Sequence, residues 1–210
     1  KTKPVLSHLS KQFHDRIDRK TYTAIVNGIP QEDDCLRISA QQAYDMGVDV
    51  DPMEDTEWNL IDYNLDDRQA VTIWRALRYV PSLYAHDNTL TLVELKPKTG
   101  RYHQLRRHMA WVCKRPLVGD AEYDKNTESA QKFRDRGLFL CSNKVMLQHP
   151  YYNTEMGRQV LEDMDEESKQ EILKDFPMVN SVVMVHGEIE LPDKFENLLA
   201  NEKQRHEKFS

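Results

Sequence analysis

The sequence is short of the features that most often reveal a protein class. No apolar run approaches the roughly 20 residues that cross a bilayer, no Cys-x-x-Cys pair occurs, and the seven glycines are scattered. We therefore expect no membrane-spanning helix, no cysteine-built zinc site and no glycine-rich phosphate loop. Cys35, Cys113 and Cys141 are odd in number and far apart, so we predict free thiols in a reducing, intracellular compartment, cytoplasmic or organellar.

Two hydrolase signatures are missing as well. The chain has no His-Glu-x-x-His helix and no Gly-x-Ser-x-Gly turn. These absences argue against a zinc hydrolase and against an α/β-hydrolase.

The charge is strongly segregated along the chain. The net charge is −6, yet the basic segment, residues 96–119, carries seven Lys or Arg and no acidic residue. The acidic segment, residues 31–67, carries twelve Asp or Glu and one Arg. Because a polyanion responds to the local field rather than to the net charge, this pattern predicts a cationic face on an otherwise acidic protein.

The hydrophobic pattern predicts one α+β domain over residues 1–210, with a mixed, mostly antiparallel sheet and flanking helices. Residues 41–67 are acidic and contain Pro52, so we predict a surface excursion or partly disordered loop there. Residues 155–178 are predicted to be a helical insertion. The expected strands are 20–26, 70–84, 89–96, 138–140, 145–148 and 181–185. A turn at His86-Asp87-Asn88 is expected to join strands 70–84 and 89–96 into an antiparallel hairpin. The expected helices are 4–14, 105–112, 127–137, an acidic helix or helix pair at 157–176, and a last one from Pro192 through Leu199.

The stretch from Leu92 to His108 carries the most chemical information. A strand runs into a Pro/Gly loop that bears Arg101, and a helix then opens with His103 and Gln104. A guanidinium on such a turn suits an anion, either a phosphate or a carboxylate that must stay ionised. The residues alone leave a second interpretation equally open, a solvated basic helix packed by its apolar stripe.

This stretch resembles a block of the RluA-type RNA pseudouridine synthases, Thr-Gly-Arg-x-His-Gln-(Leu/Ile)-Arg, at residues 99–106. The double Arg of His-Gln-Leu-Arg-Arg-His is most similar to the TruC branch of that family, which acts on tRNA. Further matches lie downstream, at Pro116–Tyr123 (Pro-Leu-x-Gly-Asp-x-x-Tyr), at Leu138–Ser142 with His149-Pro150, and at residues 189–199. Upstream, the family pattern Phe-x-x-Arg-x-Val-x-Lys-x-Tyr-x-Ala is matched by Phe13, Arg16, Lys20, Tyr22 and Ala24. Asp18 departs from it at the Val position.

The resemblance implies the pseudouridine synthase fold and isomerisation of uridine in structured RNA, tRNA or rRNA, without cofactor or metal. In that family a flipped uridine is attacked by an aspartate. Arg101 would pair with this aspartate, and Tyr22 would stack on the base or help to move its C5 proton. We expect a monomer whose RNA contacts come from Lys20, Lys96, Lys98, His103, Gln104, Arg106 and Arg107.

The family's nucleophile motif, His-Arg-Leu-Asp-x-x-Thr-Ser-Gly, is not found. Lys1-Thr2-Lys3 fits the residues that follow it, so we expect the aspartate upstream of this chain. Asp18 lies in a similar Arg-Ile-Asp-Arg-Lys-Thr run without the Ser-Gly, and we predict that it is not the nucleophile. The alternatives are a degenerate synthase that binds RNA without catalysis, and a protein-interaction domain that uses its acidic segments.

Overall fold

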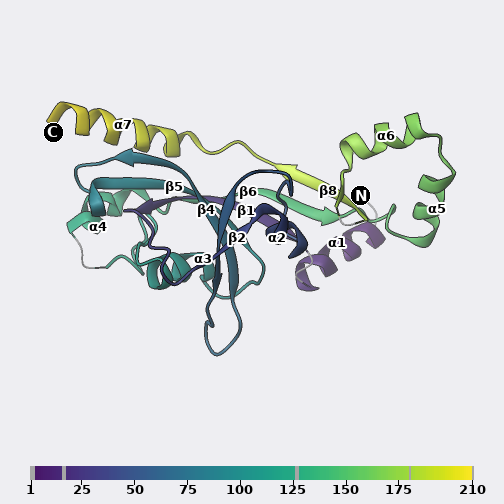
Figure 1. Cartoon of the computed structure of the whole chain (residues 1–210), viewed down its shortest axis with the longest axis horizontal. Helices are drawn as coiled ribbons and strands as arrows, with labels where there is room; N and C mark the ends of the chain where they lie inside the picture. Colours follow the sequence, from purple (N-terminus) through teal and green to yellow (C-terminus); the bar gives the residue numbers. More distant parts are fainter. Residues whose placement is uncertain (1–2, 16–17, 126–127, 180, 210) are drawn as a thin grey trace. The chain divides into compact units, whose positions relative to one another are not determined.

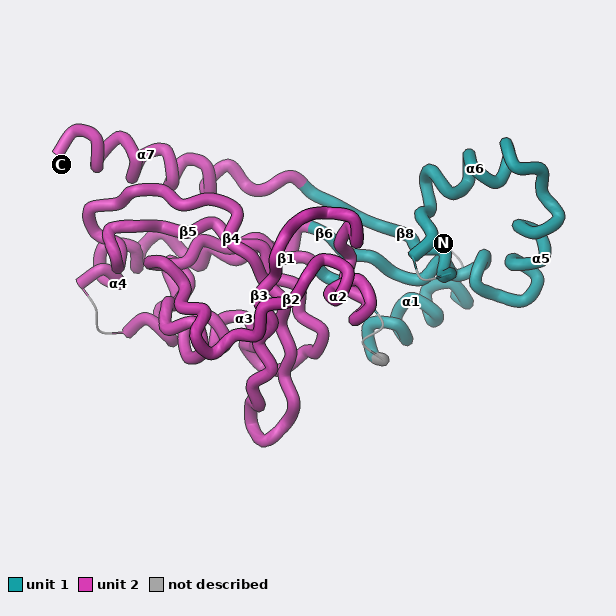
Figure 2. Tube along the Cα trace, in the orientation of Figure 1, with its two compact units in different colours: residues 1–20, 144–189 teal, residues 21–143, 190–210 magenta. Residues whose placement is uncertain are grey.

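A computed structural model describes residues 3–15, 18–125, 128–179 and 181–209 (Figure 1). Lys1, Thr2 and Arg16 of the motif matches lie outside these ranges. The chain divides into two compact units, unit 1 with residues 1–20 and 144–189, and unit 2 with residues 21–143 and 190–210 (Figure 2). The single-domain assignment stays a prediction. No helix in the described ranges is both long and apolar enough to cross a membrane.

Unit 2 is built on five antiparallel strands in the order β2-β3-β4-β5-β1. This confirms the α+β class and the mostly antiparallel sheet. The elements of this unit are β1 (Arg19–Asn27, from Thr21 on), β2 (Leu36–Ser39), α2 (Ala40–Asp45), β3 (Glu57–Asp62), β4 (Val71–Pro81), η1 (His86–Asn88), β5 (Thr89–Pro97), α3 (Gln104–Arg107), η2 (His108–Val112), α4 (Glu128–Phe133), η3 (Arg134–Arg136), the start of β6 (Leu140–Gln148) and α7 (Asp193–Phe209).

Strands β4 and β5 form the predicted hairpin, and its turn is the 3-10 helix at His86–Asn88. Asp87 and Asn88 both have positive φ there, a backbone region that Asp and Asn tolerate better than most residues. The hairpin places the end of β5, and therefore the loop that carries Arg101, beside the start of β4.

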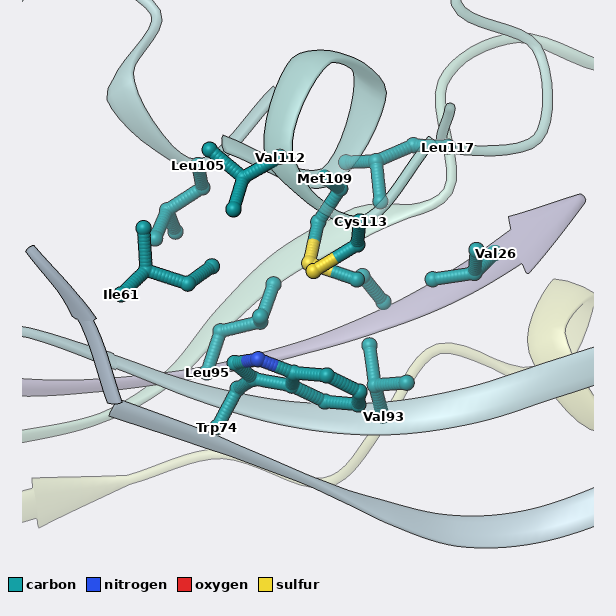
Figure 3. Packing of buried hydrophobic residues seen from close by; sticks show 11 residues of the cluster. Val26, Ile61, Trp74, Val93, Leu95, Leu105, Met109, Val112, Cys113 and Leu117 are labelled. Carbon is teal, nitrogen blue, oxygen red and sulfur yellow. The ribbon is translucent and has the colours of Figure 1, made fainter. Parts of the chain in front are cut away.

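The helix predicted at 105–112 covers one face of this sheet. Its side chains at i, i+4 and i+7, Leu105, Met109 and Val112, point toward Trp74 and the neighbouring strands (Figure 3). Burial of a Met or Leu of this kind typically stabilises a fold by about 2–5 kcal/mol relative to Ala. The segment begins as the α-helix α3 and continues as the π-helix η2, whose wider turn ends at Cys113.

Helices pack on the opposite face of the sheet in two separate hydrophobic clusters. Helix α7 and Phe133 of α4 close a cluster around Ile25 and Leu92, with Phe195, Leu198 and Leu199. Helix α2 closes another with Ala40 and Ala43, over Ile38, Trp58 and Ile73.

The prediction of a loop over residues 41–67 is wrong. The segment contains the end of α2 and all of β3, and Trp58 and Ile61 are buried on opposite faces of the sheet. A strand that is covered on both sides needs no alternation of polar and apolar residues. Strand β3 therefore lacks the pattern by which a strand is recognised, and its acidic neighbours resemble those of a surface loop.

The two strands predicted at 138–140 and 145–148 are one strand, β6 (Leu140–Gln148). Its central residues Ser142, Asn143 and Lys144 break the hydrophobic pattern. They are only half-buried or exposed, and no Gly or Pro interrupts the chain there, so the strand continues through them.

Unit 1 contains α1 (Lys3–Asp15), the end of β6, α5 (Glu155–Asp163), α6 (Glu166–Asp175), β7 (Met178–Val179) and β8 (Val182–Glu188). Strand β8 pairs antiparallel with β6 and β7. The acidic stretch predicted as a helix or helix pair is a pair, and each helix has a capped start. Thr154 Oγ1 accepts from the N–H of Gly157, and the Asp165 carboxylate accepts from the N–H of Ser168.

Candidate active site

The loop between β5 and α3 is held in place by the side chain of Gln104. Its Oε1 accepts from Thr99 Oγ1 (2.8 Å) and from the N–H of Arg101 (3.0 Å). Its Nε2 donates to the carbonyl of Val71 (2.9 Å) and to Thr72 Oγ1 (3.0 Å) on β4. The buried amide of Gln104 thus uses two donor and two acceptor positions to fasten the loop to the sheet.

The start of α3 has unusual backbone geometry. His103, the residue before the helix, has φ 50° and ψ 30°, which is the left-handed region. Few residues other than Gly adopt this region, although His does so more often than most, and such residues persist where the surrounding contacts fix the backbone. The ring of His103 contacts the hydroxyl of Tyr123 at 3.1 Å and the guanidinium of Arg106.

Arg101 is the arginine of the basic segment that has no carboxylate partner within the described ranges. Its Nε donates to the backbone carbonyl of Gln69 at 3.0 Å. The segment's other three arginines each form paired hydrogen bonds with one carboxylate, Arg106 with Asp120, Arg107 with Asp66 and Arg115 with Asp87. The half-exposed guanidinium of Arg101 therefore retains donors for a carboxylate that arrives from elsewhere.

The partner of Arg106 is a deeply buried carboxylate. Asp120 receives Arg106 Nε at 2.8 Å and Nη2 at 2.7 Å, and also accepts from the N–H groups of Glu122 and Tyr123. Burial alone would raise the pKa of Asp120, but these hydrogen bonds outweigh it and the pKa lies below its usual value. Through the two backbone hydrogen bonds Asp120 also caps its own turn.

The buried side chain of Arg107 pairs with Asp66, which lies 41 residues earlier in the acidic segment. The two Nη–O distances are 2.8 and 2.7 Å. The hydrogen bonds from Arg107 hold the pKa of Asp66 below its usual value. Arg106 and Arg107 were both predicted to bind RNA, and that role stays a prediction, since the structure shows each neutralised by a carboxylate of this chain.

Tyr22 and Lys96 lie on opposite faces of the sheet. Tyr22 pairs with Leu95 in the β1–β5 register and packs against the core cluster that contains Leu105. Lys96 follows Leu95 and therefore points the other way. Its buried Nζ donates to Thr21 Oγ1 and to the carbonyl of Asp49, and it lies 3.1 Å from Glu94 Oε1.

The remaining predicted RNA contacts differ in exposure. Lys98 is exposed, and its backbone N–H donates to the carbonyl of Val71. Lys20, in unit 1, forms an ion pair with Asp18 at 2.7 Å. Gln104 is buried and engaged inside the loop, as described above. The RNA contacts of these residues stay predictions.

Neither Asp66 nor Asp120 was predicted from the sequence as an ion-pair partner of an arginine. The rings of Tyr102, Tyr123 and Trp111 were not predicted either: Tyr102 and Tyr123 each contact the ring of His103, and Trp111 contacts the ring of Tyr123. Tyr102 and Trp111 lie within the basic segment, and this mixture of aromatic and basic residues was the one sequence feature that could have indicated the row of rings. No group of three His, Cys, Asp or Glu side chains in the described part of the chain is arranged to hold a metal ion.

Comparisons with known proteins identify the family. The model of the RNA pseudouridylate synthase family matches residues 1–111. The chain is 34% identical over 150 residues to tRNA pseudouridine synthase C of Salmonella typhimurium, covering 68% of this chain and 54% of that protein. It is 31% identical over 159 residues to tRNA pseudouridine synthase C of Vibrio parahaemolyticus, covering 72% of this chain and 61% of that protein.

The chain thus spans 54% and 61% of the length of these two relatives. Among solved structures, human RNA pseudouridylate synthase domain containing 4 matches with a TM-score of 0.51 and 20% sequence identity. That match covers 95% of this chain and 67% of the human chain, and it shows a shared fold. The chain therefore belongs to the RNA pseudouridylate synthase family, in its RluA-type group.

Proposed function

We propose that this chain forms most of the catalytic domain of an enzyme that isomerises uridine to pseudouridine in structured RNA, with tRNA as the substrate. The observation that carries the proposal is that Arg101 is held on a fixed loop and has no carboxylate partner in the described part of the chain. Gln104 fixes its loop to the sheet, and its guanidinium meets no carboxylate among the described residues. Two relatives that are named tRNA pseudouridine synthase C favour tRNA over rRNA.

In the proposed reaction the target uridine leaves its stack, which costs a few kcal/mol. An aspartate supplied by a segment outside residues 1–210 attacks the nucleoside, and the bond between N1 and the ribose breaks. The base turns, and C5 forms the new bond to the ribose as the aspartate is released. The C5 proton leaves and N1 takes up a proton, so the product is an isomer of the substrate. Because the carboxylate must stay ionised in a partly dry cleft, it needs a fixed cation, and Arg101 fills this role.

Tyr22 lies on the sheet face that α3 covers, with its ring packed against the Leu105 cluster. No hydrogen bond joins its hydroxyl to another residue that the structure describes. This leaves the hydroxyl available to a bound base, which supports Tyr22 as the residue that stacks on the uracil or helps to move the C5 proton.

The test uses the protein expressed from its complete reading frame, with Arg101→Lys as the variant. Lysine keeps the charge but lacks the planar fork that holds a carboxylate by two hydrogen bonds. We expect tritium release from tRNA labelled at uridine C5 to fall by about 100-fold or more, while tRNA affinity stays within about twofold. Arg115→Lys is the matched control, because Arg115 also pairs with a single carboxylate, Asp87, and we expect its turnover to change little.

Full turnover in Arg101→Lys would reject this role for Arg101. A complete protein that binds tRNA and forms no pseudouridine would indicate the non-catalytic RNA-binding module instead. If the complete protein did not bind RNA, the remaining alternative would be a protein-interaction domain that uses its acidic segments. Residues 1–210 alone are expected to bind RNA without turnover.

A further inference from the structure

Four aromatic rings form a continuous row beside the Arg101 loop. The Tyr102 and His103 rings are stacked with centroids 3.8 Å apart. His103 meets the Tyr123 ring edge-on at 5.8 Å, and Tyr123 meets the Trp111 ring edge-on at 5.7 Å. Because Leu105, Met109 and Val112 point into the core (Figure 3), Tyr102 and Trp111 at the two ends of this helical segment are left on its outer side.

The ends of the row are open to solvent. Tyr102 is 69% exposed and Trp111 is 42% exposed, whereas Trp58 and Trp74 are each 1% exposed. One face of the Tyr102 ring rests on His103, so its other face is the exposed one. Large rings are usually buried in the core, and an exposed row of them marks a surface that binds something.

The charges around the row favour stacking over contacts with phosphate. The guanidinium groups of Arg106 and Arg107 lie over the rings of Tyr123 and Trp111, at 4.9 and 4.7 Å. Each is neutralised by its own carboxylate, Asp120 or Asp66. The surface therefore offers flat, electrically balanced faces, which suit nucleobases better than they suit a phosphate backbone.

We propose that Tyr102, His103, Tyr123 and Trp111 form a stacking platform for unpaired nucleotides next to the target uridine. This inference rests on the proposed function and deepens it. Because any base has a π-face, the platform selects unpaired over paired RNA and carries little sequence preference. Tyr102 directly follows Arg101, so the platform begins at the loop where the target base is processed.

Trp111 provides the readout. Of the three tryptophans it alone is exposed, so a base that stacks on it quenches a fluorescence signal that the other two cannot report. The 210-residue chain is titrated with single-stranded oligouridine and, separately, with a fully paired RNA duplex. We expect the single strand to quench tryptophan fluorescence with saturation, and the duplex to quench it much less.

Variants separate stacking from other effects. Tyr102→Ala should weaken single-strand affinity about fivefold or more, and Tyr102→Phe, which keeps the ring, should bind within about twofold of the parent. Trp111→Phe should remove the quench and keep the affinity, measured by an RNA label. Tyr79→Ala is the control, since Tyr79 is 55% exposed on β4 and is no part of the row.

Single-strand binding without quenching, and with no loss in Tyr102→Ala, would overturn the platform and leave the proposed function standing. Failure to bind either RNA would reject the RNA-dependent function and the platform with it. If Tyr102→Ala instead altered the elution volume of the protein and left RNA affinity unchanged, the row would be a protein contact and the inference would be wrong.

Discussion

The side-chain carbonyl of Gln104 accepts a hydrogen bond from the backbone N–H of Arg101, and the same amide group donates to the carbonyl of Val71 on β4. A single side chain thus connects the sheet to the residue on which the chemistry is proposed to depend. Loop backbones are usually the mobile parts of a fold. This contact holds the backbone of Arg101 in a fixed position relative to β4, so that its guanidinium extends from a defined point.

Gln104→Met is expected to keep the shape of the side chain and remove its four hydrogen bonds. The Thr99 hydroxyl, the Arg101 N–H and the Val71 carbonyl would lose buried partners, so we expect unfolding free energy to fall by about 2–4 kcal/mol. Urea denaturation measures this change. Lys98→Gln, an exposed position in the same loop, should stay within about 0.5 kcal/mol, and equal losses in both variants would contradict a special role for Gln104.

The Arg106–Asp120 pair should contribute more to folding than to RNA binding. Arg106→Gln leaves a buried carboxylate with only its backbone partners, and we expect a loss of about 2–4 kcal/mol. Adding Asp120→Asn should restore part of that loss, and the double-mutant cycle gives the coupling. RNA binding that drops steeply in Arg106→Gln, with stability unchanged, would show that the arginine serves RNA instead.

His108 should make stability depend on pH. It is completely buried, and burial lowers its pKa from 6.5 to about 4. Between these values the unfolded chain binds a proton that the folded chain does not, so stability is present above pH 6.5 and is lost as pH falls toward 4. We expect a loss of about 2 kcal/mol between pH 7 and pH 5 from this group.

Urea unfolding at the two pH values, in the parent and in His108→Gln, measures this loss. Burial lowers the pKa of His149 in the same direction, so the difference between the two proteins isolates His108. An unchanged pH dependence in His108→Gln would contradict the assignment.

Asp18→Asn tests the position of the nucleophile. Asp18 is paired with Lys20, and we expect turnover of the complete protein to stay within a few-fold of the parent, as for a structural carboxylate. Tritium release from labelled tRNA is the measurement. Loss of all turnover in a folded Asp18→Asn protein would move the nucleophile into this chain.

Elements with a clear period were predictable from the sequence. The stripe of Leu105, Met109 and Val112 located the helix, and the β-branched residues of β4 and β5 located the hairpin. Strand β3 was hidden because Trp58 and Ile61 are buried on opposite faces. A strand that is buried on both faces does not alternate between polar and apolar residues, so this pattern could not reveal it.

The electrostatics of the candidate site could not be predicted, because the ion pairs join distant parts of the chain. The basic segment looked free of acidic residues, but Arg107 finds Asp66 of the acidic segment and Lys96 finds a carbonyl at Asp49. Charge runs in a sequence do not reveal which of their members neutralise one another after folding. Only once these pairs are known does Arg101 stand out as the arginine of the basic segment that meets no carboxylate in the described part of the chain.

The division of the chain has a consequence for its synthesis. The polypeptide passes between the two units after residues 20, 143 and 189, so neither unit is a continuous stretch. Phe195, Leu198 and Leu199 of α7 belong to the same core cluster as Ile25 of β1, and that cluster cannot close until residues 190–210 have left the ribosome. Until then the part of the sheet face around Ile25 and Leu92 lacks the cover of α7, and apolar surface that stays exposed in a partly folded chain promotes aggregation.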